Sequence, residues 1–279
     1  MAARTELRIT ASPFSVETHE IIIAQLAELG FDSFMESERE LLAYSSIHGA
    51  SAAIEALHSI AIPAGVSIRF SAGEADDRDW NEEWESDFVP VTVDGRCHIR
   101  ASHHPVNLAA EYNITINPRM AFGTGHNPTT YMMLEALMDM DVDGCRVLDM
   151  GCGTGVLAIM SELRKARSVT AIDNDEWAYR NTLENIKING CSRIEVLLGD
   201  AQLLANREFD VVLANINLNV LLANLPAYVQ SLARQGQMLL SGILATDVDT
   251  LLQSAKSLGL DPVTTRTREG WAMVQLHRP

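Results

Sequence analysis

The 279-residue chain has little cysteine and no long hydrophobic run. Its four cysteines, Cys97, Cys145, Cys152 and Cys191, are far apart and form no Cys-x-x-Cys pair, so the sequence indicates neither a zinc site nor a disulfide framework. No segment approaches the roughly 20 consecutive apolar residues that cross a bilayer, and residues 1–8 lack the apolar core of a secretion signal. We therefore expect a soluble, cytoplasmic protein with reduced and mostly buried thiols, no bound metal and no membrane partner.

Basic residues are also scarce, with 21 Lys and Arg against 37 Asp and Glu, which gives a formal net charge of −16. The imbalance is concentrated at the front of the chain. Residues 1–90 hold 17 acidic and 5 basic residues, whereas residues 91–279 hold 20 and 16. Direct binding to nucleic acid needs clustered Lys and Arg, so we expect none. The acidic front is compatible with a basic protein partner, or it only keeps the protein soluble.

The length is typical of two domains, and 47% hydrophobic residues suffice for a substantial core. Hydrophobic periodicity over residues 1–71 predicts strands and helices in the order β-α-β-β-α-β, which is the split arrangement of a ferredoxin-like domain. The expected strands span residues 6–11, 31–35, 40–45 and 66–71, and the expected helices span residues 15–29 and 50–58.

Residues 72–88 are expected to connect the two domains. Within them, residues 73–87 carry eight acidic residues and one basic residue. Trp80 and Trp84 are four positions apart, so on a helix they share one face and could dock the connector onto a domain while the acidic side chains stay in water. The alternative is that this acidic, aromatic segment touches the substrate.

The second predicted domain covers residues 89–279 and begins with a hairpin extension over residues 89–117. Asp94-Gly95 is a hairpin turn signal between two short apolar runs. Over residues 118–279, strands and helices alternate, which predicts a parallel, doubly wound sheet that binds ligands at the carboxyl ends of its strands. The expected strands span residues 89–93, 96–100, 114–117, 146–149, 168–173, 193–198, 209–214, 237–240, 263–267 and 271–276, and the main helices span residues 176–189, 218–233 and 246–258.

The most informative run begins where an apolar strand ends in Asp149 and continues through Gly151, Gly153 and Gly155 into a helix. Glycines at a strand-to-helix turn let the backbone approach a ligand closely. A dinucleotide fingerprint requires Gly-x-Gly-x-x-Gly, but Val156 stands at the position of its third glycine. A carboxylate here would repel a pyrophosphate and attract a cation or an ammonium group. Alternatively, Asp149 only caps the turn.

Three further polar residues follow later strands of the predicted sheet. Asp173 could accept hydrogen bonds from both hydroxyls of a ribose. Asp200 could accept one from an adenine amino group, although Gly-Asp is also a common loop pair, and Asn215 ends a buried strand. Together with the glycine turn, these residues describe a pocket for an adenosine with a cationic amino-acid tail, which is S-adenosylmethionine.

Several blocks of sequence resemble the PrmA family of bacterial ribosomal protein L11 methyltransferases. The most specific block reads Asn-Pro-Arg-Met-Ala-Phe-Gly-Thr-Gly-His-Asn-Pro-Thr-Thr over residues 117–130. The glycine turn, Val-Leu-Ala-Asn-Ile over residues 212–216, Leu-Ser-Gly-Ile-Leu over residues 240–244 and the final Gly270-Trp271 are also similar. The resemblance covers nearly the whole chain.

This resemblance implies a Rossmann-like, S-adenosylmethionine-dependent methyltransferase domain preceded by a ferredoxin-like domain that holds the ribosomal substrate. It implies cofactor contacts at Thr130, Gly151, Asp173 and Asn215, although Thr130 could simply lie in the first turn of a helix. The implied activity is methylation of lysine or N-terminal amino groups of a large-subunit ribosomal protein. Separately, we expect the enzyme to be a monomer. The alternatives are a protein-lysine methyltransferase with a non-ribosomal target and a non-catalytic assembly module that binds the cofactor.

One position departs from the family pattern, because Asn127 stands where the family usually has histidine. Asparagine keeps hydrogen-bonding capacity but does not titrate near neutrality. If this position orients a loop, little changes, whereas a role in managing a proton would be lost. For the reaction itself we expect Asn215 to orient the neutral amine rather than to act as a base, and no residue stands out as an obligatory general base.

Overall fold

The computed structural model describes residues 5–12, 18–19, 22–23, 25–26, 29–31, 33–36, 40–45, 54–55, 65–74, 88–117 and 123–279. The chain divides into two compact units, residues 1–79 and residues 80–279. Trp80, Trp84 and most of the expected acidic connector lie outside the described residues.

The first unit contains a four-stranded antiparallel sheet with the order β2-β3-β1-β4. Alternate residues of β1 are buried, with Leu7 and Ile9 fully covered, as expected for a sheet with one face on a core. The described parts of both expected helices, at residues 18–19, 22–23, 25–26 and 54–55, are helical. The strands are β1 (Thr5–Ser12), β2 (Ser33–Glu36), β3 (Leu41–Ser45) and β4 (Ser67–Glu74), close to their predicted positions.

The second unit opens with a three-stranded sheet of β5 (Val91–Val93), β6 (Cys97–Arg100) and β7 (Tyr112–Thr115). The predicted hairpin is confirmed: Asp94 and Gly95 both have positive φ, and the Arg96 N–H donates to the Val93 carbonyl at 2.9 Å. These features define a type I′ turn. The strand expected at residues 114–117 lies two residues earlier, as β7.

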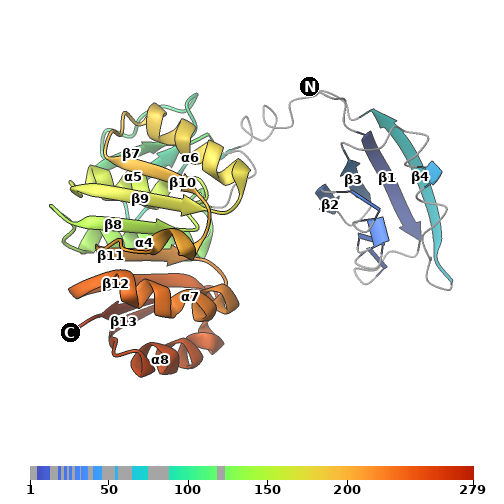
Figure 1. Cartoon of the computed structure of the whole chain (residues 1–279). Helices are drawn as coiled ribbons and strands as arrows, with labels where there is room; N and C mark the ends of the chain where they lie inside the picture. Colours follow the sequence, from blue (N-terminus) through green and yellow to red (C-terminus); the bar gives the residue numbers. More distant parts are fainter. Residues whose placement is uncertain are drawn as a thin grey trace. The chain divides into compact units, whose positions relative to one another are not determined.

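The rest of the second unit is built on a seven-stranded sheet with the order β10-β9-β8-β11-β12-β14-β13, seen in Figure 1. Its strands are β8 (Arg146–Met150), β9 (Ser168–Asp173), β10 (Ile194–Leu198), β11 (Phe209–Asn215), β12 (Leu232–Leu244), β13 (Asp261–Arg268) and β14 (Trp271–His277). Its helices are α4 (Pro128–Asp139), α5 (Val156–Leu163), α6 (Glu176–Ile188), α7 (Leu218–Ser231) and α8 (Val248–Ser257), with short 3-10 turns η1 (Ala201–Leu204) and η2 (Ala245–Asp247).

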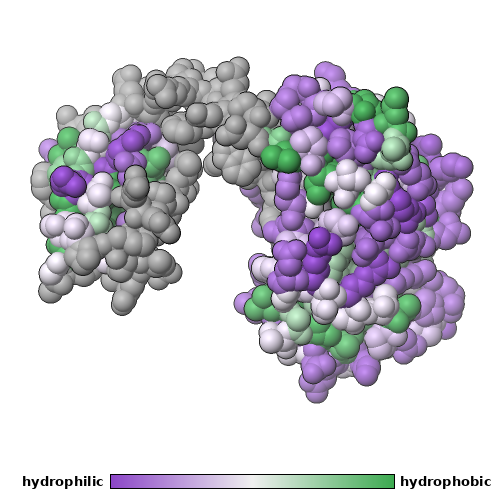
Figure 2. All heavy atoms as spheres, turned by 180° about the vertical axis from the view of Figure 1, so that it is seen from behind, coloured by the Kyte–Doolittle hydropathy of each residue, from purple (hydrophilic) through white to green (hydrophobic). Residues whose placement is uncertain are grey.

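Helices cover both faces of this sheet (Figure 1). Successive strand residues point to opposite faces, so Val147 belongs to one hydrophobic cluster and Leu148 to the other. The first cluster contains α4 and α5, and the second contains α7 and α8. Figure 2 shows hydrophilic residues over most of the visible face of this unit, as expected when the apolar sides of the helices are turned onto the sheet. The doubly wound architecture is confirmed.

The expectation of a parallel sheet is wrong for β14, which pairs antiparallel with both β12 and β13. The turn between β13 and β14 consists of Glu269 and Gly270, both with positive φ. A two-residue turn can only join antiparallel neighbours, because a parallel connection needs a long crossover. The remaining neighbouring pairs, from β10 to β12, are parallel.

The described cysteines are unpaired, with Cys97 and Cys152 buried and the other two partly buried. Burial raises the pKa of the Cys97 and Cys191 thiols to about 12, so neither is an ionised nucleophile near neutrality. Across the described part of the chain, no helix combines the length and the apolar character that a membrane span requires.

Candidate functional site

Polar side chains gather at the carboxyl ends of four neighbouring strands of the large sheet. Asp200 follows β10, Asp173 ends β9, Asp149 lies near the end of β8 and Asn215 ends β11. Since these strands are parallel and adjacent, their carboxyl ends meet at one edge. The fold therefore brings together the residues that the sequence predicts for one ligand site.

The glycine turn after β8 is held by the neighbouring strand, because Gly151 and Cys152 both donate backbone hydrogen bonds to the Ile172 carbonyl. All three glycines have positive φ, between 56° and 77°. A Cβ on Gly151 would collide with the Ile216 side chain, and one on Gly155 would lie 2.8 Å from Thr182. These two glycines are therefore required by protein packing as well as by the ligand approach that the sequence predicts.

Asp149 is 1% exposed, and its carboxylate accepts a hydrogen bond from the Ala158 N–H at 3.0 Å. Ala158 lies in the first turn of α5, so the capping role considered from the sequence is realised. Burial raises the pKa of Asp149 to about 7, the negative charge of Asp173 adds to the rise, and the Ala158 hydrogen bond opposes it. A direct contact between Asp149 and a ligand stays a prediction.

Asp173 is 9% exposed and holds the middle of the glycine turn. Its Oδ2 accepts from the Gly153 N–H at 2.9 Å, and its Oδ1 accepts from the Asp175 N–H at 3.0 Å. The carboxylate is thus fixed in position beside the turn, where a ribose could reach it. Its contact with ribose hydroxyls stays a prediction.

Asp200 is exposed and caps the 3-10 turn η1, because its Oδ1 accepts from the Gln202 N–H at 2.8 Å. Asp200 therefore has the structural role in a loop that the sequence offered as the alternative to ligand binding. The capping bond uses Oδ1, which leaves the second carboxylate oxygen as an acceptor for the predicted adenine contact.

Asn215 and Thr130 meet at the end of β11, although 85 residues separate them in the chain. The Asn215 Nδ2 donates to the Thr130 Oγ1 at 3.1 Å, and Thr130 itself is fully buried in the first turn of α4. The Asn215 Oδ1 is buried and has no hydrogen-bond partner within the described part of the chain. A buried carbonyl oxygen without a donor is costly, so this atom is suited to accept a hydrogen bond from a ligand.

Ile216, directly after Asn215, is held between two glycines. Its side chain faces Gly151, and a Cβ on Gly242 would lie 2.5 Å from the Ile216 carbonyl oxygen. Ile216 also donates its N–H to the Ser241 carbonyl at 3.1 Å. This close packing explains the glycine in the Leu-Ser-Gly-Ile-Leu block and fixes the backbone that presents Asn215.

Sequence reasoning missed Thr154 and Asn185. They connect this edge to the block of residues 117–130, which we call the Phe-Gly-Thr-Gly block after its residues 122–125. Thr154 lies inside the glycine turn and donates its hydroxyl to the Gly123 carbonyl at 2.7 Å. Asn185 on α6 donates to the Thr154 carbonyl at 2.8 Å and accepts from the Asn117 N–H at 2.7 Å. The spacing of Asn181, Asn185 and Asn189, four apart on a predicted helix, was the signal that could have found this face.

Asn127, the residue that departs from the family pattern, is the N-cap of α4 and accepts from the Thr129 N–H and hydroxyl. This is a loop-ordering role that asparagine performs well. Trp177 is 67% exposed, as expected for a surface residue. His103 and His104 pack their rings 4.0 Å apart on the loop after β6. Residues 118–122 of the Phe-Gly-Thr-Gly block lie outside the described residues.

The edge fits S-adenosylmethionine by the chemistry of its donor set. Asp149, Asp173 and Asp200 supply carboxylates, which suit hydroxyl, amino and sulfonium groups and oppose phosphate. The unpartnered Asn215 Oδ1 supplies a neutral acceptor at the same edge. These groups would hold the ribose, the adenine and the amino-acid tail, while the acceptor oxygen of Asn215 remains for the substrate.

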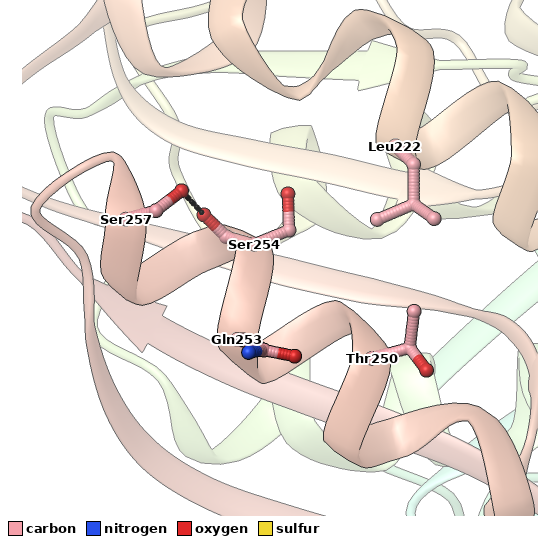
Figure 3. Close-up of a pocket in the computed structure, with 5 residues that line it drawn as sticks. All are labelled: Leu222, Thr250, Gln253, Ser254 and Ser257. Carbon is pink, nitrogen blue, oxygen red and sulfur yellow. Dashed lines mark hydrogen bonds between the residues drawn. The ribbon is translucent and has the colours of Figure 1, made fainter.

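A shallow groove elsewhere on this unit lies between α7 and α8 (Figure 3). It is lined by Leu222, Thr250, Gln253, Ser254 and Ser257. None of these side chains is charged or titrates near neutrality, and none is a predicted site residue. The groove therefore offers no charged side chain for holding a charged cofactor.

Known proteins resemble this chain over nearly its whole length. The family model described as ribosomal protein L11 methyltransferase (PrmA) matches residues 9–279. Ribosomal protein L11 methyltransferase of Phocaeicola vulgatus is 40% identical over 274 residues, with 97% of each chain covered. That of Porphyromonas gingivalis is 42% identical over 275 residues, covering 97% of this chain and 94% of the relative.

A similar fold occurs in the crystal structure of ribosomal protein L11 methylase from Lactobacillus delbrueckii subsp. bulgaricus. The TM-score is 0.63 at 24% identity, and the match covers 68% of this chain and 99% of that chain. The resemblance read from the sequence is confirmed, and so is the assignment to S-adenosylmethionine-dependent methyltransferases. The chain belongs to the ribosomal protein L11 methyltransferase (PrmA) family.

Proposed function

We propose that this protein transfers methyl groups from S-adenosylmethionine to lysine or N-terminal amino groups of ribosomal protein L11. The observation that carries the proposal is the buried, unpartnered Oδ1 of Asn215 beside Thr130. A neutral amine presents N–H donors, so it satisfies this acceptor where an ionised carboxylate, which has no donor, would not. The family relationship supplies the ribosomal protein as substrate.

Bound S-adenosylmethionine supplies an already activated methyl group on its sulfonium centre. The protein must therefore align a neutral amine with that group, and alignment alone can supply much of the rate. The Asn215 Oδ1 accepts a hydrogen bond from the amine and directs its lone pair away from the amide. Thr130 holds the other end of the Asn215 side chain, because its hydroxyl accepts from Nδ2. The proton that the amine loses goes to solvent.

Each of the three carboxylates would bind a different part of the cofactor. Asp173 would accept from the ribose hydroxyls and Asp200 from the adenine amino group. Asp149 and the turn of Gly151, Gly153 and Gly155 would face the amino-acid tail. The Gly153 N–H already bonds to Asp173, so the ribose site and the glycine turn form one rigid unit.

The first unit would recognise the ribosomal protein. Its antiparallel order β2-β3-β1-β4, with helical residues between β1 and β2 and between β3 and β4, supports a ferredoxin-like domain over residues 1–71. Residues 72–88 would connect it to a methyltransferase domain over residues 89–279. The acidic front half suits a basic ribosomal protein. We further propose that the enzyme is a monomer that acts in the cytoplasm.

The proposal is tested by incubating the purified protein with methyl-labelled S-adenosylmethionine and a mixture of ribosomal proteins. Label in ribosomal protein L11 supports it. Label only in another protein would favour a different target, and no label in any protein would refute the proposed activity.

A further inference from the structure

Helix α6 presents a row of amide side chains to the chain leaving β7. Asn189 accepts from the Thr115 N–H at 2.9 Å and donates to its carbonyl at 2.6 Å. Two residues later, the Asn117 N–H donates to Asn185 at 2.7 Å, and the Asn117 carbonyl accepts from Asn181 at 3.0 Å. Four helical residues rise about 6 Å and two strand residues about 6.7 Å. Because these two distances are nearly equal, amide side chains four residues apart on the helix can bond to every second residue of the extended backbone, as a neighbouring strand would.

Asn185 differs from the other members of this row because it also reaches the glycine turn. It is fully buried, and its Nδ2 donates to the Thr154 carbonyl at 2.8 Å and to Asn181 Oδ1 at 3.1 Å. Asn185 therefore links Asn117 to Thr154 through a single side chain. Its hydrogen-bonding groups are used within the protein rather than left for a ligand.

Thr154 makes a second link on its other side. Its hydroxyl donates to the Gly123 carbonyl at 2.7 Å, and Thr154 is also fully buried. Gly123 has φ of 109°, and a Cβ there would lie 2.9 Å from the Thr154 Oγ1. The close approach thus requires glycine at position 123.

Gly123 lies four residues before Asn127, the N-cap of the helix that carries Thr130. Thr130 in turn holds the Asn215 amide. The Thr154 hydrogen bond therefore fixes Gly123, the backbone of residues 123–127 leads from there to the start of α4, and Thr130 on α4 holds the Asn215 side chain. The chain on the other side, at Asn117, is fixed to the same turn by Asn185.

We propose that Thr154 and Asn185 are positioning residues for methyl transfer, which keep the start of α4, and so the Thr130–Asn215 pair, aligned with the cofactor turn. The inference rests on the proposed function. The hydrogen bonds of both side chains are made to other parts of the protein. Their loss misplaces the acceptor relative to the methyl group, so it lowers kcat without weakening cofactor binding.

The test compares Thr154→Val, which keeps the shape and removes the hydroxyl, with Thr154→Ser, which restores it. Asn189→Ala is the matched control. It removes side-chain hydrogen bonds to the Thr115 backbone, and, within the described residues, the Asn189 side chain makes no such bond to the glycine turn. For each full-length variant we would measure the melting temperature, the dissociation constant of S-adenosylhomocysteine, and kcat and KM for ribosomal protein L11.

We expect Thr154→Val to lower kcat roughly 10- to 100-fold, with the S-adenosylhomocysteine dissociation constant unchanged and activity restored by Thr154→Ser. Asn189→Ala should lower the melting temperature and keep kcat. Unchanged kcat in Thr154→Val, a loss confined to cofactor affinity, or an equal loss of kcat in Asn189→Ala would each overturn the inference.

A second variant keeps the test decisive if Thr154→Val does not fold. Gly123→Ala disturbs the contact between Gly123 and Thr154, because the added Cβ would lie 2.9 Å from the Thr154 Oγ1. This variant must show the same selective loss of kcat. Inactive wild-type protein would refute the proposed function, whereas active wild-type protein with fully active variants would refute only the positioning role.

Discussion

The side chain of Asn215 has one end fixed and the other free for a ligand. Thr130 holds its Nδ2, while its buried Oδ1 has no partner in the described residues. This asymmetry gives the amide a defined direction at the edge of the sheet. Under the proposed function, the free acceptor would set the position of the substrate amine and its orientation toward the methyl donor.

Replacing Asn215 with alanine removes the acceptor and should lower kcat by roughly a hundredfold, since misalignment by about 1 Å has that effect. Steady-state kinetics with ribosomal protein L11 would measure the loss. Thr130→Ser keeps the hydroxyl that orients the amide and should retain most of the activity. An Asn215→Ala enzyme with wild-type kcat would show that the amide does not orient the amine.

Asp173 and Asp175 are neighbouring carboxylates with different roles. Asp173 fixes the glycine turn and faces the predicted ribose site, whereas Asp175 caps α6 by accepting from the Trp177 N–H at 2.9 Å. Asp173→Ala should weaken S-adenosylhomocysteine binding at least tenfold, because hydrogen bonds to a charged group contribute about 1.5–3 kcal/mol each. Calorimetry would measure the affinity.

Asp175→Ala is the matched control for this prediction. Loss of the cap should lower the free energy of unfolding by about 1 kcal/mol and leave the cofactor affinity unchanged. Equal cofactor affinity in the two variants would contradict the ribose assignment.

At the scale of elements, strand β8 and helix α5 are joined by the buried Asp149 carboxylate. Burial raises its pKa to about 7, so between about pH 4 and pH 7 the folded protein retains a proton that the unfolded chain has lost. The folded state then binds more protons, and the contribution of Asp149 to the free energy of unfolding falls as the pH rises through this range.

Asp149→Asn should remove this dependence while keeping an acceptor for the Ala158 N–H. Relative to wild type, the variant should gain stability as the pH rises from about 4 to 7 and show a constant difference above pH 7. Urea unfolding at several pH values would measure this. A difference that does not change with pH would mean that Asp149 titrates normally.

Elements with strong local signals were predictable from the sequence, and long-range contacts were not. Strand β9 lies at its predicted residues because an apolar run ends sharply at Asp173. The direction of β14 was missed, although Glu269-Gly270 is a turn signal of the same kind as Asp94-Gly95. Local periodicity places a strand, but its pairing depends on its connections.

In the candidate site too, some residues were predictable from the sequence and the long-range contacts between them were not. Asp149, Asp173, Asp200 and Asn215 could be found because each follows a predicted strand, and parallel strands bring their ends together. The hydrogen bond from Asn117 to Asn185 spans 68 residues, and that from Thr154 to Gly123 spans 31. Only the folded chain reveals which of many polar residues meet across such separations.

The whole molecule contains two compact units, which we expect to have separate roles. The second unit, residues 80–279, has its own hydrophobic clusters and contains every predicted cofactor residue. A chain of residues 80–279 should therefore fold and bind S-adenosylhomocysteine as tightly as the full protein, while methylation of ribosomal protein L11 is lost. Calorimetry and the methylation assay on the same preparation would measure both. Full methylation by the shortened chain would contradict substrate recognition by the first unit.

Methylation of the amino groups of ribosomal protein L11 is best tested by mass spectrometry. Intact and digested ribosomal protein L11 would be measured after incubation with the full-length protein and S-adenosylmethionine. We expect added methyl groups on lysine or N-terminal nitrogen atoms, which disappear with Asn215→Ala. An unmodified ribosomal protein L11, or methyl groups only on atoms other than amino nitrogen, would contradict the account.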